Sequence, residues 1–361
     1  MQNTESGPIA DSLPNPLQLE VADWSQYALV IDARSPREYQ EDHVPGAVNL
    51  PVVNDEEYAE VGTLHKTDTH AAYLIGVEYS LRNIANHIKP LIAKFDRRDR
   101  MLVYCFRGGK RSKLWADNLR TIGFNVDVIK GGWKNYRRWV RESLEVLPRH
   151  FEYRVLSGST GCGKTRLLHA LAAAGQQIID LEELASHRGS LLGKLPGRSQ
   201  PTQKWFDSLL LEYMRGLDPN RPVWLEAESK KIGNVQLPDA LFEAMHQTVP
   251  IHVTAPMEER VRLWREDYPH LASDPVMLVN LLEPLKPLVG GEELKLWREM
   301  ADTGRVDELF ARVMTHHYDL CYERSTKRNY KASDESPRIE LDSLRPERLA
   351  EVATELAEKF T

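Results

Sequence analysis

The sequence predicts an α/β protein with two parallel-sheet domains and a helical C-terminal region. Short apolar runs alternate with helical patterns over residues 28–140, a second alternating set begins near residue 153, and strand signals end after Pro256. Strands that alternate with helices form parallel sheets with helices on their faces. The expected divisions are a first domain at 1–145, a second domain at 146–256, and a mostly helical region at 257–361 that packs on the second domain.

The first domain shows three strand patterns and one clear helix. ALVIDA (28–33) and RMLVYC (100–105) are apolar runs of strand length, and VDVIKGG (126–132) is a third run that ends in a glycine turn. Between the last two, SKLWADNLRTIGF (112–124) has the apolar spacing of an amphipathic helix that Gly123 would stop.

The second domain repeats the alternation with four strand patterns. These are YRVLSG (153–158), QQIIDL (176–181), RPVWLEAE (221–228) and PIHVTAP (250–256). The run TRLLHALAAAG (165–175) between the first two has a helical apolar pattern. We therefore expect a second parallel sheet.

Bulk composition indicates an ordinary globular protein. The 361 residues are 42% hydrophobic and 28% charged, with no apolar run near the roughly 18 residues that span a bilayer. The N-terminal segment MQNTESGPIADSLPNP is polar and Pro-rich, without the basic start and apolar core of a signal peptide. Three cysteines are too few and too scattered for a disulfide framework or a zinc site. We expect a reduced, cytoplasmic protein without a membrane partner.

Charge is distributed unevenly along the chain. Residues 1–60 contain twelve acidic and two basic residues, whereas residues 97–141 contain thirteen basic and three acidic residues. The basic stretch also contains Trp115, Trp133, Tyr136 and Trp139. Cations mixed with aromatic rings suit nucleic acid, but tryptophans more often fill a core while cations solvate helix faces. The core interpretation is favoured for the tryptophans, and a polyanionic partner for the excess of cations.

The segment VYCFRGGKRS (103–112) places a cysteine at the end of a strand, before a loop rich in glycine and cations. Backbone N–H groups and cations that surround a thiol favour its thiolate form, and glycines allow the backbone angles that such a loop needs. Cys105 is the candidate nucleophile, with Arg107 and Arg111 as catalytic partners. The remaining candidates of this anion-binding loop are Gly108, Gly109, Lys110 and Ser112.

Three motifs, VIDARSPREYQEDHVPGAVNLP, VYCFRGGKRS and GFNVDVIKGGW, occur in this order and together resemble the rhodanese family over about residues 15–140. The resemblance implies a rhodanese-like domain in which the loop after the central strand wraps back, so that its N–H groups point at the cysteine sulfur. Asp32 and Arg34, at the end of the earlier strand, either brace this loop or form an ordinary buried ion pair.

The loop departs from the usual rhodanese pattern. Sulfur-transferring rhodaneses commonly have an arginine five residues after the cysteine, whereas here Lys110 holds that position and Arg111 follows. The resulting Cys-x5-Arg spacing is similar to the loop of dual-specificity phosphatases, so the loop should accept an anion of phosphate size. The alternative is an inactive rhodanese module with a spectator cysteine.

The segment SGSTGCGKT follows a strand pattern and precedes a helix pattern, which is the context of a P-loop. Its amides and Lys164 would hold a diphosphate or triphosphate, and Thr165 would hold Mg²⁺. Cys162 would contribute only its backbone. The second domain is therefore expected to be P-loop NTPase-like. The phosphate-binding candidates are Gly158, Ser159, Thr160, Gly161, Cys162, Gly163, Lys164 and Thr165.

Other candidates in the second domain depend on less specific signals. Glu226, Glu228 and Asp180 end strand patterns and could orient a metal-bound water, act as a base, or serve as ordinary caps and salt-bridge residues. None of them defines a metal site on sequence grounds. The stretch 187–210 is rich in Gly, Arg and Ser and is expected to be a mobile substrate loop. Its candidate substrate contacts are His187, Arg188, Arg198 and Gln203.

The strings CFRGGKRS, GSTGCGKT, LEELASHRGSLLG, PTQKWF and LEAESKKIG occur in one order. With them the chain resembles the tRNA 2-selenouridine synthase family over about residues 15–330. The resemblance implies a transferase that acts on a wobble 5-substituted 2-thiouridine of tRNA. Geranyl diphosphate first gives an S-geranyl intermediate, and selenium from selenophosphate then replaces the S-geranyl group.

The same resemblance implies roles for the two loops. Cys105 would accept or position selenium, Arg107 and Arg111 would hold selenophosphate, and the P-loop would bind the head of geranyl diphosphate. Mg²⁺ is expected, and no tightly bound organic cofactor. The basic stretch 97–141, together with the C-terminal tail, would bind the anticodon arm of tRNA.

Three alternatives from other classes stay open. A P-loop kinase or ATPase with a regulatory rhodanese domain would turn over ATP without tRNA. A Cys-x5-Arg phosphatase would release phosphate from aryl phosphates and lose that activity in Cys105→Ser. A tRNA-binding scaffold with vestigial loops would do neither.

Overall fold

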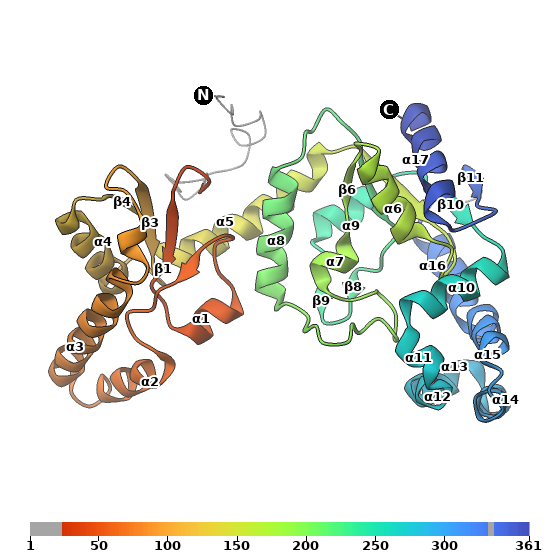
Figure 1. The fold of residues 1–361 in the computed structure, drawn as a ribbon, viewed down its shortest axis with the longest axis horizontal. Helices are drawn as coiled ribbons and strands as arrows, with labels where there is room; N and C mark the ends of the chain where they lie inside the picture. Colours follow the sequence, from red (N-terminus) through yellow and green to blue (C-terminus); the bar gives the residue numbers. More distant parts are fainter. Residues whose placement is uncertain (1–23, 331–335, 361) are drawn as a thin grey trace. The chain divides into compact units, whose positions relative to one another are not determined.

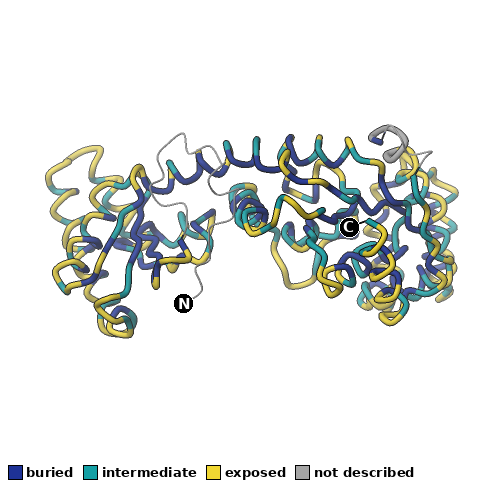
Figure 2. Tube along the Cα trace, turned by 90° about the horizontal axis from the view of Figure 1, so that it is seen from above, coloured by how far each residue is buried: buried dark blue, intermediate teal, exposed yellow. Residues whose placement is uncertain are grey.

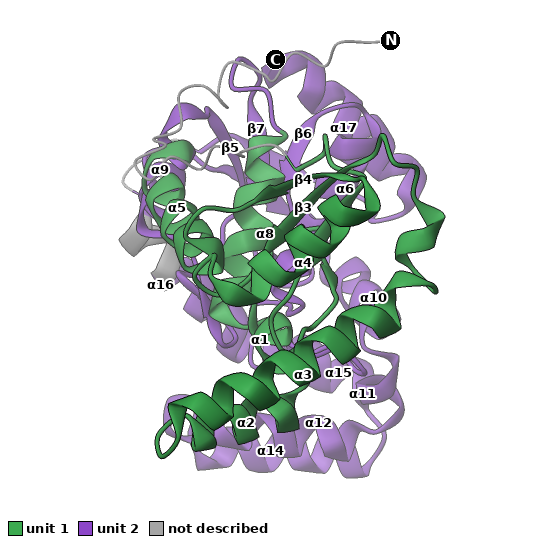
Figure 3. Ribbon diagram, turned by 90° about the vertical axis from the view of Figure 1, so that its left-hand side faces the viewer, with its two compact units in different colours: residues 1–147, 201–216 green, residues 148–200, 217–361 purple. Residues whose placement is uncertain are grey.

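A computed structural model describes residues 24–330 and 336–360, which form two compact units (Figure 3). Unit 1 comprises residues 1–147 with Pro201–Gly216, and unit 2 comprises Pro148–Gln200 with Leu217–Thr361. The Pro-rich N-terminal segment, for which the sequence predicts no signal peptide, lies outside the described residues. Each unit has its own parallel sheet and its own core, as the sequence predicts.

Unit 1 contains a four-stranded parallel sheet of order β2-β1-β3-β4 (Figure 1). Ile31 of β1 pairs with Val48 of β2 on one side and with Val103 of β3 on the other. Because β3 lies inside the sheet, the residue that follows it, Cys105, leaves from the middle of the sheet edge. The strands are β1 (Leu29–Asp32), β2 (Val48–Asn49), β3 (Arg100–Tyr104) and β4 (Asn125–Val128).

The helices of unit 1 include one that the sequence predicts well. The predicted helix over 112–124 is α4, which begins two residues earlier and ends at Gly123 with a φ of +109°. The helices are α1 (Pro36–Glu41), α2 (Asp55–Leu64), α3 (Thr69–Ile88), η1 (Ile92–Lys94), α4 (Lys110–Ile122), α5 (Gly132–Val146), η2 (Leu147–His150), which continues into unit 2, and α8 (Gln203–Arg215).

The core of unit 1 contains the aromatic side chains of the basic stretch. Helices α3 and α4 pack on the sheet face formed by alternate residues of β1 and β3. Trp115 is fully buried there and donates from Nε1 to the Leu50 carbonyl at 2.9 Å. Trp133 and Trp139 are also buried, and Figure 2 shows buried residues concentrated inside the unit. The core interpretation of the tryptophans is confirmed.

Helix α8 corrects two expectations, because the sequence places residues 203–210 in a mobile loop of the second domain. It packs instead on α5 within unit 1, where Phe206 is fully buried. Arg137 of α5 donates to Ser208 Oγ at 3.1 Å, and Ser208 Oγ donates to Asp42 Oδ1 at 2.7 Å. Buried polar groups need such partners, so this network fixes α8 to unit 1.

Unit 2 contains a five-stranded parallel sheet of order β11-β10-β5-β7-β6. The four predicted strands are present, with β5 at the centre. The region after Pro256 is mostly helical, but it also contributes β11, which the sequence analysis missed because this strand is three residues long with one apolar side chain, Ile339. The strands are β5 (Tyr153–Ser157), β6 (Gln177–Ile179), β7 (Val223–Glu226), β10 (Ile251–Thr254) and β11 (Arg338–Glu340), and a separate hairpin is formed by β8 (Lys231–Ile232) and β9 (Val235–Gln236).

The helices of unit 2 form two groups. Helices α6 and α17 pack on the sheet, whereas α10 to α15 have an apolar cluster of their own that includes Trp264, Trp297 and Phe310. Within the described ranges, no helix is both long and apolar enough to cross a membrane. The helices are α6 (Lys164–Ala173), α7 (Leu181–Ala185), α9 (Asp239–His246), α10 (Met257–Asp267), α11 (Pro269–Ser273), α12 (Pro275–Leu282), η3 (Glu283–Leu285), α13 (Lys286–Val289), α14 (Gly291–Asp302), α15 (Val306–Val313), the π-helical turn η4 (Met314–Tyr318), α16 (Asp319–Asn329) and α17 (Pro346–Phe360).

Candidate functional site

The Cys105 thiol lies directly after β3 and is 3% exposed. Its Sγ is 3.3 Å from Ser112 Oγ. Burial would raise the pKa of the thiol, but hydrogen bonds from the Ser112 side chain and amide, the charge of Arg111 and the Gly109 amide lower it below its usual value. The loop therefore favours a thiolate, which is the nucleophilic form of cysteine.

The cations of the loop do not all face the thiol. Arg111 acts on the Cys105 charge and is held by Glu38, with 2.6 Å between Nη1 and Oε2. Lys110 is exposed, and its Nζ lies 3.5 Å from the centroid of the Tyr73 ring. Arg107 is also exposed, with its guanidinium 5.7 Å from its neighbour's aromatic ring. Of the predicted partners, Arg111 is the one whose charge reaches the sulfur.

Close backbone packing explains some of the loop glycines. Gly108 has a φ of +67°, and a Cβ there would lie 2.9 Å from the Ile129 carbonyl. Gly109 has a φ of −99° and nothing within 4 Å of an added Cβ, so close packing does not explain this glycine. A Cβ on Gly132 would lie 2.1 Å from the Cys105 carbonyl. Gly132 is not among the residues predicted from the sequence, although the paired glycines in VIKGGW are a signal for it.

Asp32 and Arg34 form a buried ion pair, with 2.6 Å between Oδ2 and Nη2 and at most 1% exposure of either side chain. Arg34 also donates to the Asp42 carbonyl, and the Tyr104 hydroxyl donates to Asp32 Oδ2 at 2.8 Å. The pair therefore joins the end of β1 to the last residue of β3, immediately before Cys105. It is thus a buried ion pair that also supports the strand that carries the loop, so the two interpretations of these residues do not exclude each other.

The P-loop connects β5 to α6 in unit 2. Gly158 has a φ of +142°, and a Cβ there would lie 2.1 Å from the Val253 carbonyl. Lys164 Nζ donates to the carbonyls of Gly158 at 2.8 Å and Ser159 at 3.3 Å. Cys162 is fully buried in the apolar core, and burial raises the pKa of its thiol. Its side chain is thus placed for packing, in keeping with the expected backbone-only role.

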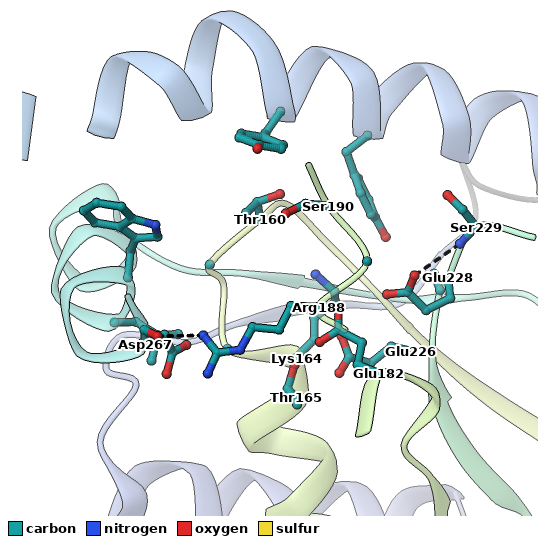
Figure 4. A pocket seen from close by; sticks show the side chains of 18 of the residues that line it. Thr160, Lys164, Thr165, Glu182, Arg188, Ser190, Glu226, Glu228, Ser229 and Asp267 are labelled. Atoms are coloured by element: carbon teal, nitrogen blue, oxygen red, sulfur yellow. Dashed lines mark hydrogen bonds between the residues drawn. The ribbon is translucent and has the colours of Figure 1, made fainter. Parts of the chain in front are cut away.

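A cavity of about 610 Å³ opens over the P-loop (Figure 4). Part of its lining comes from the loop and α6, namely Thr160, Gly161 and Gly163 to Arg166. Carboxylates and one arginine of the following segments form another part, namely Glu182, Arg188, Glu226 and Glu228. The lining also includes aromatic side chains from the helical region, namely Trp264, Tyr268, Tyr318, Tyr322 and Tyr330.

Three glutamates meet beside Lys164 and Thr165 in this cavity (Figure 4). Glu226, which is 6% exposed, forms a hydrogen bond with the Thr165 side chain. Burial and the charge of Glu226 raise the pKa of Glu228 to about 7, and burial together with both neighbouring carboxylates raises the pKa of Glu182. Glu182 is a further residue that sequence reasoning missed, although it lies within the quoted run LEELASHRGSLLG.

Asp180 is displaced from this group. It caps α7 by accepting from the Glu183 amide at 2.8 Å, and its Oδ2 is 2.7 Å from His169 Nε2. The lining of the cavity includes Glu226 and Glu228 but not Asp180. Among the three possible metal or base residues, Asp180 therefore takes the capping role that its position at a strand end also allowed.

The four predicted substrate contacts separate in the structure. Arg188 lines the cavity and donates to the Asp267 carbonyl at 2.9 Å (Figure 4). His187 lies outside the lining, and burial lowers the pKa of its imidazole. Arg198 pairs with Glu183 at 2.8 Å on the surface. Gln203 begins α8 in unit 1, so it cannot be assigned to this cavity.

The oxygen donors of the cavity fit a magnesium ion that is shared with a phosphate ligand. Mg²⁺ in nucleotide sites is held by a P-loop hydroxyl, one or two carboxylates, phosphate oxygens and water. Thr165 and Glu226 supply a bonded hydroxyl and carboxylate. Within the described part of the chain, no group of three His, Cys, Asp or Glu side chains could hold a metal ion by itself. A bound ion would therefore depend on the ligand for its remaining contacts.

Comparison with known proteins matches both units. Residues 16–138 match the rhodanese-like domain family, and residues 151–278 match the family described as the AAA domain of tRNA 2-selenouridine synthase. Several curated relatives carry the name tRNA 2-selenouridine synthase. The protein of Nitrosomonas europaea is 37% identical over 66% of this chain and 63% of its own length. The proteins of Hydrogenovibrio crunogenus and Sulfurovum sp. are 36% and 33% identical, over 66% and 75% of this chain and 67% and 71% of their own lengths.

The fold and the two loops define a class of protein that combines a rhodanese-like domain and a P-loop domain in one chain. The aligned region covers about two thirds of the length of these relatives. The chain belongs to the tRNA 2-selenouridine synthase family, as its motifs predict.

Proposed function

We propose that this chain is a transferase that converts a wobble 5-substituted 2-thiouridine of tRNA to 2-selenouridine through an S-geranyl intermediate. The observation that carries the proposal is the presence of two separate loops suited to two phosphorylated donors. One loop holds the Cys105 thiol with a lowered pKa, and the other forms the floor of a 610 Å³ cavity. The names of the relatives support selenation of tRNA. The two donors, geranyl diphosphate and selenophosphate, are part of the proposal.

In the first step, the sulfur of the base attacks carbon 1 of geranyl diphosphate. A sulfur–carbon bond forms, the carbon–oxygen bond breaks, and diphosphate leaves. Lys164 and the P-loop amides stabilise the charge that develops on the leaving diphosphate. Thr165 and Glu226 would hold Mg²⁺, which would neutralise part of the same charge. Glu228, whose pKa is about 7, can accept a proton from the base in the same cavity.

In the second step, selenide from selenophosphate adds to carbon 2 of the base, the carbon–sulfur bond breaks, and geranyl thiol leaves. A thioether sulfur departs more readily than a thiocarbonyl sulfur, which is the chemical reason for the first step. To release the selenium, the Cys105 thiolate attacks the phosphorus of selenophosphate, so that the phosphorus–selenium bond breaks and selenide is positioned beside the base. Arg111 with the loop amides holds the phosphate, and water then hydrolyses the sulfur–phosphorus bond to release it. The wobble base must be unstacked from the anticodon loop in order to react.

The experiment that tests this function is mass spectrometry of nucleosides from 2-thiouridine-containing tRNA. The protein and Mg²⁺ receive geranyl diphosphate first and selenophosphate second. We expect a geranyl adduct that converts to 2-selenouridine. In Cys105→Ser, selenation falls by about a hundredfold or more while geranylation persists. Unimpaired selenation in that variant would exclude Cys105 as the nucleophile.

A P-loop kinase or ATPase is the second candidate, because the same cavity could hold a nucleotide. It predicts ATP hydrolysis that does not require tRNA. Unmodified tRNA together with such hydrolysis would replace the proposed function. Release of phosphate from aryl phosphates that depends on Cys105 would indicate the phosphatase instead.

A further inference from the structure

Two exposed tyrosines stand at the rim of the Cys105 loop. Tyr58 of α2 is 47% exposed and Tyr73 of α3 is 45% exposed. The Arg111 guanidinium lies 5.5 Å from the Tyr58 ring centroid, and Lys110 Nζ lies 3.5 Å from the Tyr73 ring centroid. Both rings thus contact cations of the loop that carries the reactive thiol.

These rings contrast with Trp115, Trp133 and Trp139 of the basic stretch, which are buried and cannot meet a ligand. An exposed ring beside a cation matches the way in which proteins hold single-stranded nucleic acid. Bases stack on the ring, while the cation meets the neighbouring phosphate. The His65 ring, also exposed, meets Tyr73 edge-on at 5.6 Å and extends this surface.

Two of the carboxylates near Tyr58 accept hydrogen bonds within the protein. Glu57 accepts from the Asn83 side chain at 2.7 Å, and Glu60 accepts from the Tyr79 hydroxyl at 2.8 Å. Lys110, in contrast, is exposed at the start of α4. Lys110 gives the rim a positive charge beside Tyr73, which suits a phosphate backbone.

We propose that Tyr58 and Tyr73 form a stacking platform for single-stranded nucleotides of an RNA substrate, with Lys110 binding the phosphate between them. The platform rests on the proposed function, since a loop nucleotide of tRNA is what must reach Cys105. It assigns RNA binding to α2, α3 and the start of α4. The buried tryptophans of the basic stretch take no part.

Exposed apolar residues continue along α3 from the platform. Leu74, Val77 and Leu81 are 62%, 46% and 47% exposed. This stripe by itself would also suit a second copy of the chain. Lys110 on the Tyr73 ring and Arg111 beside Tyr58 favour RNA, because a contact between apolar faces would have to desolvate these cations.

The test measures binding rather than turnover. The probe is an anticodon stem-loop RNA with 2-thiouridine at the wobble position, and its Kd is measured by fluorescence anisotropy. In Tyr58→Leu/Tyr73→Leu we expect the Kd to rise by about tenfold or more, because stacking on each ring is lost. Tyr58→Phe/Tyr73→Phe retains both rings and should keep the Kd within about twofold. Lys110→Ala should lower the salt dependence of binding by about one phosphate contact.

Tyr213 of α8 is a matched control, since it is an exposed tyrosine (42%) of the same unit. Tyr213→Leu should bind the RNA like wild type. Wild-type affinity in the double leucine variant would overturn the platform. So would a change of oligomeric mass in that variant with unchanged RNA affinity, because the surface would then join copies of the chain. Ring-dependent RNA binding without any selenation would keep the platform and reject the proposed function.

Discussion

The Tyr322 hydroxyl accepts a hydrogen bond of 2.6 Å from the backbone amide of Gly158, the first residue of the P-loop. Tyr322 belongs to α16, and its ring centroid is 5.4 Å from Lys164 Nζ. The first residue of the same helix, Asp319, pairs with Arg260 at 2.7 Å, and Arg260 donates to the Thr160 carbonyl. Helix α16 is thus attached to the P-loop directly at Gly158 and, through Arg260, at Thr160.

Tyr322→Phe should destabilise unit 2 by about 1 kcal/mol, because it removes one partly buried hydrogen bond. Tyr322→Leu should cost about 1 kcal/mol more, since the ring beside Lys164 is also lost. The measurement is the free energy of unfolding in urea. Equal stability of wild type and the phenylalanine variant would show that the Gly158 amide finds another partner.

The buried glutamates predict a stability that falls as pH rises. The pKa of Glu228 is raised to about 7 and that of Glu182 is raised further, whereas both titrate near 4.5 in an unfolded chain. Between pH 5 and pH 7 the folded state therefore binds more protons than the unfolded state, so the free energy of unfolding decreases with pH. Glu182→Gln should remove part of this slope and raise the melting temperature at pH 8.

Glu183→Gln is the matched control for that prediction. Glu183 is the next residue of α7, but it is exposed and pairs with Arg198. Its substitution should leave the slope unchanged. The measurement is the melting temperature of wild type, Glu182→Gln and Glu183→Gln from pH 5 to pH 8. A wild-type melting temperature that rises over this range would show that the cavity carboxylates are ionised in the folded protein.

Gly132 and Gly46 form a matched pair with positive φ angles of +61° and +79°. A Cβ on Gly132 would lie 2.1 Å from the Cys105 carbonyl, whereas nothing lies within 4 Å of a Cβ on Gly46. Gly46→Ala should therefore cost only the backbone strain, about 1–2 kcal/mol. Gly132→Ala must also shift the Cys105 loop, so it should cost more than about 3 kcal/mol or prevent folding. Comparable urea unfolding curves for the two variants would contradict this account.

Sequence patterns predicted the sheets well because strand length and apolar runs are local properties. The strand before Cys105 and the strand before Gly158 end where the motifs require. Helix α8 was misplaced because its attachment to α5 depends on Arg137, Asp42 and Ser208, which are far apart in sequence. The segment before α8 is rich in glycine, so without knowledge of those partners the sequence suggests a loop.

The candidate sites show the same division between local and distant effects. The spacing of Cys105 and Arg111 identified the thiol loop, but it could not show that Lys110 rests on Tyr73. Motif spacing identified the P-loop, but it could not show that Glu182 and Tyr322 reach the same cavity from distant segments. Contacts made by tertiary packing are absent from a single sequence.

Ser112 is the strongest local influence that lowers the pKa of the Cys105 thiol, through its side chain and its amide. Ser112→Ala removes the hydroxyl but retains the amide and Arg111. We expect the pKa of Cys105 to rise in this variant, so that alkylation by iodoacetamide requires a higher pH. The measurement is the rate of alkylation at Cys105 as a function of pH, read by mass spectrometry of the labelled peptide.

The control for this prediction is Ser112→Thr, which retains a hydroxyl at the same position of α4. It should keep the midpoint of the alkylation profile closer to that of wild type than alanine does. Selenation should follow the thiolate fraction, so its loss in Ser112→Ala at pH 7 should be partly restored at pH 9. An alkylation profile that is identical in wild type and Ser112→Ala would show that Arg111 and the loop amides stabilise the thiolate without the hydroxyl.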